Sequence, residues 1–388
     1  MRYEPRHLNL HVTNKCNNYC RFCYISATQH DKNEFFLDSN IMIRTINEFS
    51  KCSLNPNAKI VFTGGEPTLK FNDILNTLSY IQESHINYSP VMFTNGGLLG
   101  AIGKYRKNKV ISHMLNFSGL NKHTPKSAVN ELKKAGLNGI TVSVDANHTS
   151  FNDNLKCHQV PLYCIKELFD QLLDQGYGTA ENELILDVSY SDAEKQKSEE
   201  IIENLISHLN FKKKGNDYIK DNQIIIRRGV VGFTLVGRVG ETNVEQLKLE
   251  DALDLTCEKL NGKKEGYGPL CFNYEHGPDI DSNGDVYFCN GQSFLIGNIF
   301  EDNLQNIFLA LNTNHSINEK YGANIKILNF MSNFTKQNKR NCIGETLNIL
   351  IQKEPDLLKT INNAAGLCWN LGRNKDLQQI ILNYIINY

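Results

Sequence analysis

The stretch that decides how this sequence is interpreted is Cys16-Asn17-Asn18-Tyr19-Cys20-Arg21-Phe22-Cys23, in which three cysteines are spaced C-x3-C-x2-C. Three thiolates this close together can hold three corners of a cubane iron–sulfur cluster, because thiolates are the usual protein ligands of such clusters. The fourth iron would receive no ligand from this stretch. An open site on a redox cluster can bind and reduce a small molecule, so the spacing favours catalysis over electron storage.

Closely spaced cysteines also occur in zinc sites and in disulfide frameworks. Zinc sites usually show C-x2-C pairs with a matching second half. A disulfide framework is typical of short secreted chains, whereas this chain has 388 residues and residues 1–9 lack the apolar stretch of a signal peptide. We expect a cytoplasmic protein, in which 11 cysteines indicate metal binding or catalysis.

Composition and charge argue against several classes of partner. Apolar residues make up 40% of the chain, enough for a sizeable core, and the net charge is −1. Such a balance creates no global field that would attract nucleic acid or an anionic membrane. The basic run at 211–215 is short and turn-like, which favours an exposed hairpin tip. With no apolar stretch of about 20 residues to cross a bilayer, we expect neither a nucleic-acid nor a membrane partner.

Short apolar, β-branched runs alternate with amphipathic helical stretches from residue 7 to about residue 240. This alternation predicts an α/β fold of right-handed βαβ units around a parallel sheet. The strands are expected over 7–12, 59–62, 90–93, 139–144, 184–189 and 230–236. The helices are expected after a cap at Ser39 and over 71–83, 126–135, 162–173 and 192–209. The segment 103–124 fits the alternation badly and is interpreted as an insertion.

Candidate site residues follow the carboxyl ends of these strands, where ligand-binding groups lie in parallel barrels. The second strand leads into Gly64-Gly65-Glu66-Pro67, in which glycines allow close approach to a ligand and proline stiffens the loop. Asn95 follows the third strand, where a simple turn is the alternative. Ser143 and Asp145 end the fourth strand on one face, with a helix cap as the alternative for Asp145.

A second cysteine pattern lies outside the alternating region. Cys271 is followed by Gly284 and then, after four further residues, by Cys289. The segment 279–287 between them predicts a β-hairpin with an Asn-Gly turn. Because a hairpin brings its two ends together, Cys271 and Cys289 can share one metal centre. Zinc or free thiols are the alternatives.

These motifs resemble those of the radical S-adenosylmethionine (SAM) superfamily. Cys16, Cys20, Phe22 and Cys23 are similar to its CX3CXΦC signature, and Gly64–Pro67 are similar to its GGEP motif. The resemblance implies a partial (β/α)6 barrel that holds a [4Fe–4S] cluster with an open iron. It further implies reductive cleavage of SAM to methionine and a 5′-deoxyadenosyl radical, with Cys16, Cys20 and Cys23 as the catalytic and metal-binding residues.

The resemblance also assigns candidate SAM contacts. In the superfamily, the segment equivalent to Gly64, Gly65, Glu66 and Pro67 binds the methionine amino group, and Phe22 belongs to the cluster loop. Asn95, Ser143 and Asp145 are expected beside SAM. Arg238, in a Gly-Arg-Val segment after the sixth strand, is expected either on the SAM carboxylate or at the surface.

The element from Cys271 to Cys289 resembles that of SPASM and twitch domains, which implies an auxiliary iron–sulfur cluster. Cys342 and Cys368 are the expected further ligands, with Cys257 as a rival. A full SPASM domain continues with a dense cysteine run that this chain lacks, so a twitch-type domain is favoured. We expect a partial barrel over 1–240, an auxiliary-cluster domain over 245–305 and a helical region over 306–388.

Many SPASM and twitch proteins act on peptides, so the resemblance implies oxidation, epimerisation or crosslinking of a ribosomally made precursor peptide. An external one-electron reductant of the flavodoxin or ferredoxin type is the implied partner. One alternative is a radical dehydrogenase or another modification of a small molecule or nucleotide. A second is a non-enzymatic iron–sulfur scaffold. His148 is a possible acid or base, although a solvated loop histidine is favoured.

Overall fold

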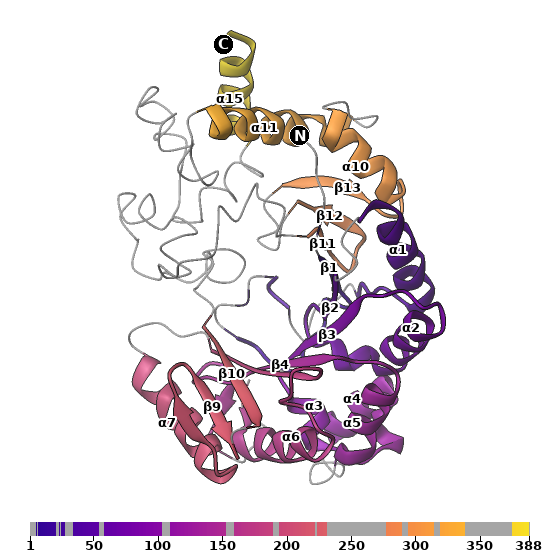
Figure 1. Cartoon of the computed structure of the whole chain (residues 1–388). Coiled ribbons are helices and arrows are strands. Elements are labelled where there is room, and N and C mark those ends of the chain that lie inside the picture. The colour runs from indigo at the N-terminus through magenta and orange to yellow at the C-terminus, as the bar shows by residue number, and fades with distance from the viewer. Residues whose placement is uncertain are drawn as a thin grey trace.

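Parallel strands form the centre of one large curved sheet (Figure 1). The computed structural model describes residues 5, 7–20, 23, 25–27, 34–53, 58–102, 109–152, 159–188, 194–221, 223–230, 277–288, 294–313, 319–337 and 375–387. Within these residues the parallel strands are, in sheet order, β1 (His7–His11), β2 (Lys59–Thr63), β3 (Ser89–Thr94), β4 (Gly139–Ser143), β7 (Glu183–Val188) and β10 (Ile224–Val230). The arrangement is that of a partial TIM-like barrel.

Helices between the strands cover the outer side of this sheet (Figure 1). They are α1 (Ser39–Cys52), α2 (Phe71–Glu83), α3 (Gly97–Ala101), α5 (Pro125–Lys134), α6 (Leu162–Asp174) and α7 (Lys195–His208). The short strands β5 (Thr149–Ser150) and β6 (Val160–Pro161) pair beside α6. Side chains alternate across each strand, so Leu8 and Leu10 of β1 are fully buried in the apolar core, whereas Asn9 faces the inner side.

Antiparallel strands extend the sheet at both ends. At one end β8 (Lys212–Lys214) and β9 (Asp217–Lys220) form the hairpin predicted for the exposed lysine run and lead into β10. At the other end β11 (Asp279–Ile280), β12 (Asp285–Tyr287) and β13 (Leu295–Asn298) follow one another, and β11 lies parallel to β1. The predicted hairpin over 279–287 is therefore confirmed, with Gly284 in its turn at φ +85°. In the described residues the two ends of the sheet do not pair, so the barrel is open.

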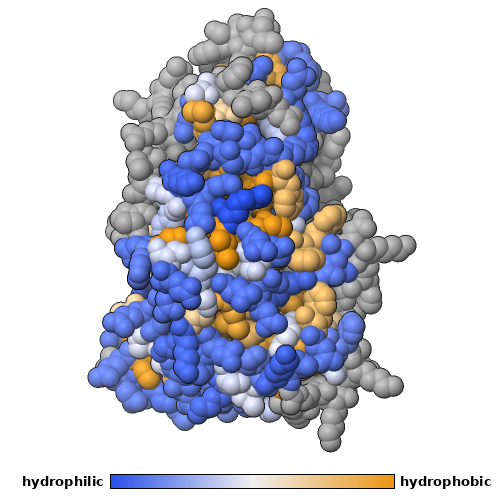
Figure 2. Space-filling model, turned by 90° about the vertical axis from the view of Figure 1, so that its right-hand side faces the viewer, coloured by the Kyte–Doolittle hydropathy of each residue, from blue (hydrophilic) through white to orange (hydrophobic). Residues whose placement is uncertain are grey.

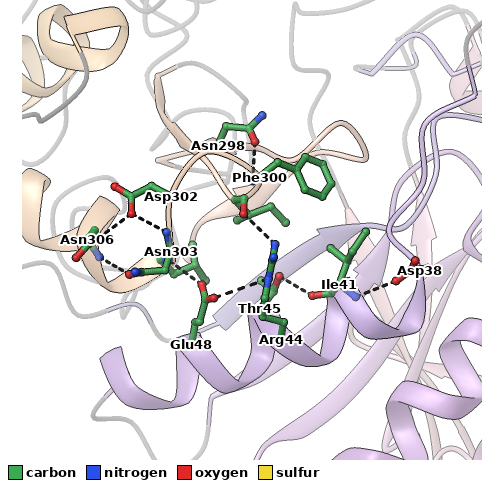
Figure 3. A network of polar contacts seen from close by, with 12 residues as sticks. Asp38, Ile41, Arg44, Thr45, Glu48, Asn298, Phe300, Asp302, Asn303 and Asn306 are labelled. Carbon is green, nitrogen blue, oxygen red and sulfur yellow. Dashed lines mark hydrogen bonds and ion pairs between the residues drawn. The ribbon is translucent and has the colours of Figure 1, made fainter.

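Polar contacts fix this added hairpin to the barrel helix α1 (Figure 3). Arg44 Nη2 donates to the Ile299 carbonyl over 2.9 Å, just after β13. Glu48 accepts from the Leu304 backbone N–H over 2.8 Å, where α10 (Leu304–Thr313) begins. A carboxylate at a helix N-terminus satisfies an otherwise unpaired N–H and favours the helix dipole. The hairpin region and the barrel are thus held together on the helical side as well as in the sheet.

Three helices account for most of the described residues after β13. They are α10, α11 (Glu319–Gln337) and α15 (Lys375–Asn387). Asn329 Nδ2 donates to the Leu311 carbonyl over 2.9 Å, which ties α11 to α10. The face of the molecule covered by helices is mostly hydrophilic, with apolar patches near its middle (Figure 2). Among the described helices, none has the length and apolar character to span a bilayer.

Two sequence expectations need correction. The sixth parallel strand is β10 at Ile224–Val230, because its first half pairs with β9 and its second half with β7. Of the predicted range, residues 231–236 lie outside the described residues. The cap of α1 is Asp38, whose carboxylate accepts from the Ile41 N–H over 2.9 Å, whereas Ser39 is already the first helical residue.

The presumed insertion contains a helix that supports the site. Within 103–124 the structure describes α4 (Lys109–Ser118) and the 3-10 helix η2 (Leu120–Lys122). Helix α4 packs on the 3-10 helix η1 (Pro67–Lys70), which follows the Gly-Gly-Glu-Pro loop. The Lys70 ammonium lies 3.4 Å from the ring centroid of Phe36 and 4.3 Å from that of Phe117. These contacts join the end of the cysteine loop, η1 and α4.

Candidate active site

The cysteine loop and the Gly-Gly-Glu-Pro loop lie against each other at the carboxyl ends of β1 and β2. The Gly65 N–H donates to the Thr13 carbonyl over 2.7 Å, and the Glu66 N–H donates to the Lys15 carbonyl over 2.8 Å. A Cβ atom on Gly65 would lie 1.9 Å from the Lys15 carbonyl oxygen. Gly64 has φ +122°, a conformation that disfavours other residues. The glycines are therefore required for the contact between the two loops.

The three cysteines of the motif lie on this loop, with Cys16 and Cys20 buried and Cys23 half-buried. Two sulfurs accept from backbone N–H groups of the loop, Cys16 from Asn18 and Cys23 from Ala27, each over 3.3 Å. Burial first, and then the neighbouring Cys20 and Glu66, raise the pKa of the Cys16 thiol well above its ordinary value. Such N–H donors suit a cluster, because hydrogen bonds to sulfur stabilise and tune ligating thiolates.

In the described part of the chain, no three His, Cys, Asp or Glu side chains lie in position to share one metal ion. Thiolates of a cubane cluster bind different irons, and they therefore stand further apart than the ligands of a single ion. The buried thiols and their N–H donors are the features that fit a cluster here. Phe22, which also belongs to the motif, lies outside the described residues.

Glu66 is fully buried beside the cysteine loop and lies at the start of η1. Its Oε1 accepts from the Thr68 hydroxyl over 2.5 Å and from the Thr94 hydroxyl over 2.7 Å, and its Oε2 accepts from the Asn95 N–H over 2.9 Å. Burial raises the pKa of this carboxyl, although the hydrogen bonds work in the opposite direction. A buried carboxylate held by neutral donors is suited to pair with an ammonium group of a ligand.

Asn95, at the end of β3, lies between Glu66 and Cys16. Its side-chain amide exchanges hydrogen bonds with the Asn17 amide over 2.8 and 3.2 Å. The same amide donates from Nδ2 to Cys16 Sγ over 3.6 Å. The structure thus brings Cys16, Glu66 and Asn95 together from the ends of three neighbouring strands, as the sequence predicts for a shared site.

Asp145 and His148 form a largely buried pair after β4. The Asp145 carboxylate accepts from the Asn147 and His148 backbone N–H groups over 2.8 and 3.0 Å, and its Oδ2 lies 2.8 Å from His148 Nδ1. Burial lowers the pKa of His148, but the Asp145 charge and the contact with Cys20 outweigh it and raise the pKa well above the ordinary value. The expectation of a solvated His148 is wrong, because Asp145 draws the ring inward beside the cysteine loop.

Asp187 of β7 extends this polar edge, although it was not among the residues predicted from the sequence. It pairs in register with Ser143, which is half-buried. Burial raises the pKa of the Asp187 carboxyl from 3.8 to about 6, and the neighbouring Asp145 contributes. The alternation of side chains along the strand could have indicated Asp187. Ile185 and Asp187 point to one side of β7, and the residues between them point to the other side and are buried.

A second buried pair joins β1 to the added hairpin. His11 Nε2 lies 2.7 Å from Asp279 Oδ1, and both side chains are buried. Burial lowers the pKa of His11, but the Asp279 charge and hydrogen bond outweigh it and raise the pKa. Sequence reasoning missed this pair because its members are 268 positions apart.

Below the site, the inner face of the sheet lines a cavity of about 240 Å³. The side chains of Asn9, Val61, Val91 and Thr141 contribute to its wall. At the start of β7, Glu183 binds Lys59 of β2 over 2.9 Å and Arg227 of β10 over 2.7 Å.

The remaining predicted site residues lie outside the described residues: Arg238, Cys271, Cys289, Cys342, Cys368 and the rival ligand Cys257.

Comparisons with known proteins agree with this geometry. The family model described as "Radical SAM superfamily" matches residues 10–186, which run from β1 through the cysteine loop into β7. Radical SAM cyclopropyl synthase TigE of Paramaledivibacter caminithermalis is 24% identical over 309 residues, 75% of this chain and 59% of TigE. GTP 3′,8-cyclase of Vibrio vulnificus is 32% identical over 144 residues, 36% of this chain and 34% of the cyclase.

The solved structure of polyhistidine-tagged anSMEcpe with bound AdoMet has the same fold. It superimposes with a TM-score of 0.53 at 15% identity, covering 99% of this chain and 94% of that one. The chain spans only 59% and 34% of the length of the two sequence relatives, so their activities are not assigned to this chain. The matched family model, the shared fold and the convergence of the cysteine loop with Glu66 lead to one conclusion. Residues 10–186 of the chain form a domain of the radical SAM superfamily.

Proposed function

We propose that this enzyme abstracts hydrogen from a ribosomally made peptide and thereby oxidises, epimerises or crosslinks it. The main support for the proposed site is that the ends of three strands meet there. Cys16 follows β1, Glu66 follows β2, and Asn95 follows β3, and Asn95 is hydrogen-bonded to both of the others. Cys16, Cys20 and Cys23 would hold the [4Fe–4S] cluster and leave its fourth iron open.

A cluster held by Cys16, Cys20 and Cys23, together with bound SAM, would supply the radical chemistry, namely one-electron reductive cleavage of SAM and abstraction of a hydrogen atom from the substrate. The protein supplies the binding groups. The buried Glu66 carboxylate is placed to receive the SAM ammonium, and the close loop contact at Gly65 fixes its distance from the cysteine loop. Ser143, Asp145 and Arg238 remain proposed SAM contacts.

The open barrel supports a peptide substrate. The two ends of the sheet do not pair in the described residues, and a barrel left open in this way suits an extended substrate. An extended chain needs such an opening, whereas a small molecule does not. The similarity to TigE also extends over 75% of the chain, compared with 36% for GTP 3′,8-cyclase. A small-molecule substrate is the second candidate, favoured by the cavity of about 240 Å³.

Three further parts of the proposal concern the rest of the chain and its surroundings. We propose an auxiliary iron–sulfur cluster held by Cys271 and Cys289 of a twitch-type domain over 245–305, with Cys342 and Cys368 of the helical region over 306–388 as its further ligands. The described hairpin over 279–287 supports it, because β11 and β12 direct the chain on either side toward one end. An external one-electron reductant would serve the barrel cluster, and a reducing cytoplasm would suit both clusters.

The experiment uses anaerobically purified protein reconstituted with iron and sulfide, with dithionite as reductant. We expect 5′-deoxyadenosine from SAM, and we expect Cys20→Ala to abolish it while Cys164→Ala, in the apolar face of α6, leaves it unchanged. Short peptides encoded beside the gene are then added. Substrate-dependent stimulation of deoxyadenosine formation and a mass or stereochemical change in one peptide would support the proposal.

Two results would contradict it in different ways. Iron bound without any SAM cleavage would indicate an electron-carrying scaffold. SAM cleavage that GTP or another small molecule stimulates, while no peptide does, would indicate the small-molecule alternative and would leave the radical SAM assignment intact.

A further inference from the structure

We infer that Asn95 is a positioning residue that acts on the iron–sulfur cluster through Cys16 and makes no contact with SAM through its side chain. This inference rests on the proposed cluster at Cys16, Cys20 and Cys23. It replaces the expectation, from sequence alone, that Asn95 touches SAM. Three features of the side chain carry it: the direction of its amide, the number of its partners and its burial.

The direction of the Asn95 amide follows from one neighbour that can only donate. The Gly97 backbone N–H lies 2.8 Å from one terminal atom of the Asn95 side chain. A backbone N–H needs an acceptor, so that atom must be the carbonyl oxygen Oδ1. The amide nitrogen Nδ2 therefore points the other way, toward Asn17 Oδ1 at 2.8 Å and Cys16 Sγ at 3.6 Å. The group facing the sulfur is a hydrogen-bond donor.

The hydrogen-bonding capacity of this side chain is used in full. An asparagine amide has two N–H donors and two acceptor lone pairs. The donors go to Asn17 and Cys16, and the lone pairs receive the Gly97 N–H and the Asn17 amide. The backbone N–H of Asn95 is bound to Glu66 Oε2. No donor or acceptor of the side chain is left for the polar groups of SAM.

Close packing holds the amide in this orientation. Asn95 and Cys16 are both buried. A Cβ atom on Gly97 would lie 2.6 Å from Asn17 Nδ2 and 2.9 Å from Asn95 Oδ1, so the pair of amides fills the space beside this glycine. A hydrogen bond in such surroundings is electrostatically stronger than in water. The donor is therefore fixed against the sulfur before any cluster binds.

A fixed donor at a ligating sulfur favours the reduced cluster. Reduction adds negative charge, part of which resides on the thiolate sulfurs, and an N–H aimed at one of them stabilises that charge. Hydrogen bonds to the sulfurs are among the factors that set cluster potentials. Through its backbone N–H the same residue also binds Glu66, so Asn95 couples the cluster ligand Cys16 to the proposed SAM-binding carboxylate.

The test compares reconstituted wild-type protein with Asn95→Ala and Asn95→Asp. Asn95→Ala deletes the donor, and Asn95→Asp keeps the oxygen that faces Gly97 but replaces the donor with an acceptor. The matched control is Asn14→Ala, which removes a side chain of the same type from the same loop, where its oxygen accepts from the Phe35 N–H. The midpoint potential is followed by electron paramagnetic resonance, and the barrel cluster is identified by its spectral change on addition of SAM.

We expect both Asn95 variants to bind SAM and to show a more negative midpoint potential than Asn14→Ala, with the larger shift in Asn95→Asp. A roughly tenfold lower ratio of reduced to oxidised cluster at a fixed potential corresponds to about 59 mV for one electron. An unchanged potential with weakened SAM binding would overturn the inference and restore the SAM contact. If neither Asn95 variant holds iron while Asn14→Ala holds its cluster, the inference is overturned as well. A wild-type protein that holds no reducible cluster would reject the proposed function itself.

Discussion

Replacing Gly65 by alanine tests the claim that the site depends on contact between two loop backbones. The new Cβ would lie 1.9 Å from the Lys15 carbonyl oxygen and 2.5 Å from the Lys15 carbonyl carbon. Both atoms are backbone, so the clash cannot be relieved by rotating a side chain. The loops must separate, which breaks the bonds from Gly65 N–H to Thr13 and from Glu66 N–H to Lys15.

The size of the effect follows from these contacts. Each lost backbone hydrogen bond contributes about 0.5–1.5 kcal/mol, and overpacking adds about 1–3 kcal/mol. The free energy of unfolding of the metal-free protein is therefore expected to fall by about 2–6 kcal/mol. Because Glu66 moves with the loop, SAM binding by the reconstituted protein is expected to be lost as well.

Gly215→Ala is the matched control for this change. Gly215 lies at the tip of the β8–β9 hairpin with φ +64°, and a Cβ there has no atom within 4 Å. Gly215→Ala should lower the free energy of unfolding by about 1–2 kcal/mol, because it introduces backbone strain and no clash. Both variants are compared by urea denaturation and by iron and SAM binding. The reasoning is refuted if Gly65→Ala is no less stable than Gly215→Ala and still binds SAM.

Two further predictions follow from buried charges near the site. Lys70→Met keeps the aliphatic stem beside Phe36 and Phe117 but removes the ammonium, which also pairs with Glu34 over 3.3 Å. We therefore expect the free energy of unfolding, measured by urea denaturation, to fall by about 0.5–2 kcal/mol. Lys320→Met, whose ammonium is 5.0 Å from the Tyr321 ring at an exposed position, should cost less, and an equal cost would contradict the buried cation–π contact. Asp187 has a pKa of about 6 in the folded protein against 3.8 ordinarily, so the folded state binds its proton more tightly and wild-type stability falls as pH rises from about 4 to 6. Asp187→Asn should therefore be more stable at pH 7, by up to about 3 kcal/mol, and should lose that advantage below about pH 4. An advantage that does not change with pH would show that ionisation is not its cause.

Local patterns in the sequence predicted most of the barrel. Strands β1 to β4 and β7 and helices α2, α5 and α6 lie within a few residues of the predicted ranges, because each buries a regular apolar face. The hairpin over 279–287 was equally predictable, since Asn-Gly turns favour positive φ. The boundary of β10 was not predictable, because hydrophobicity alone does not show which stretch of the chain pairs with a neighbouring strand on each side.

The local sequence around each motif determined the chemistry of this protein. Cys16, Cys20 and Cys23 are within eight residues, and Glu66 belongs to a four-residue motif, so their types and spacing could be interpreted without a fold. Only the tertiary structure decided how these groups are oriented. Asn95 points at Cys16, and His11 meets Asp279, because strands far apart in the chain come together in the sheet. The pairing of strands, a long-range property, sets these contacts, and no local pattern contains it.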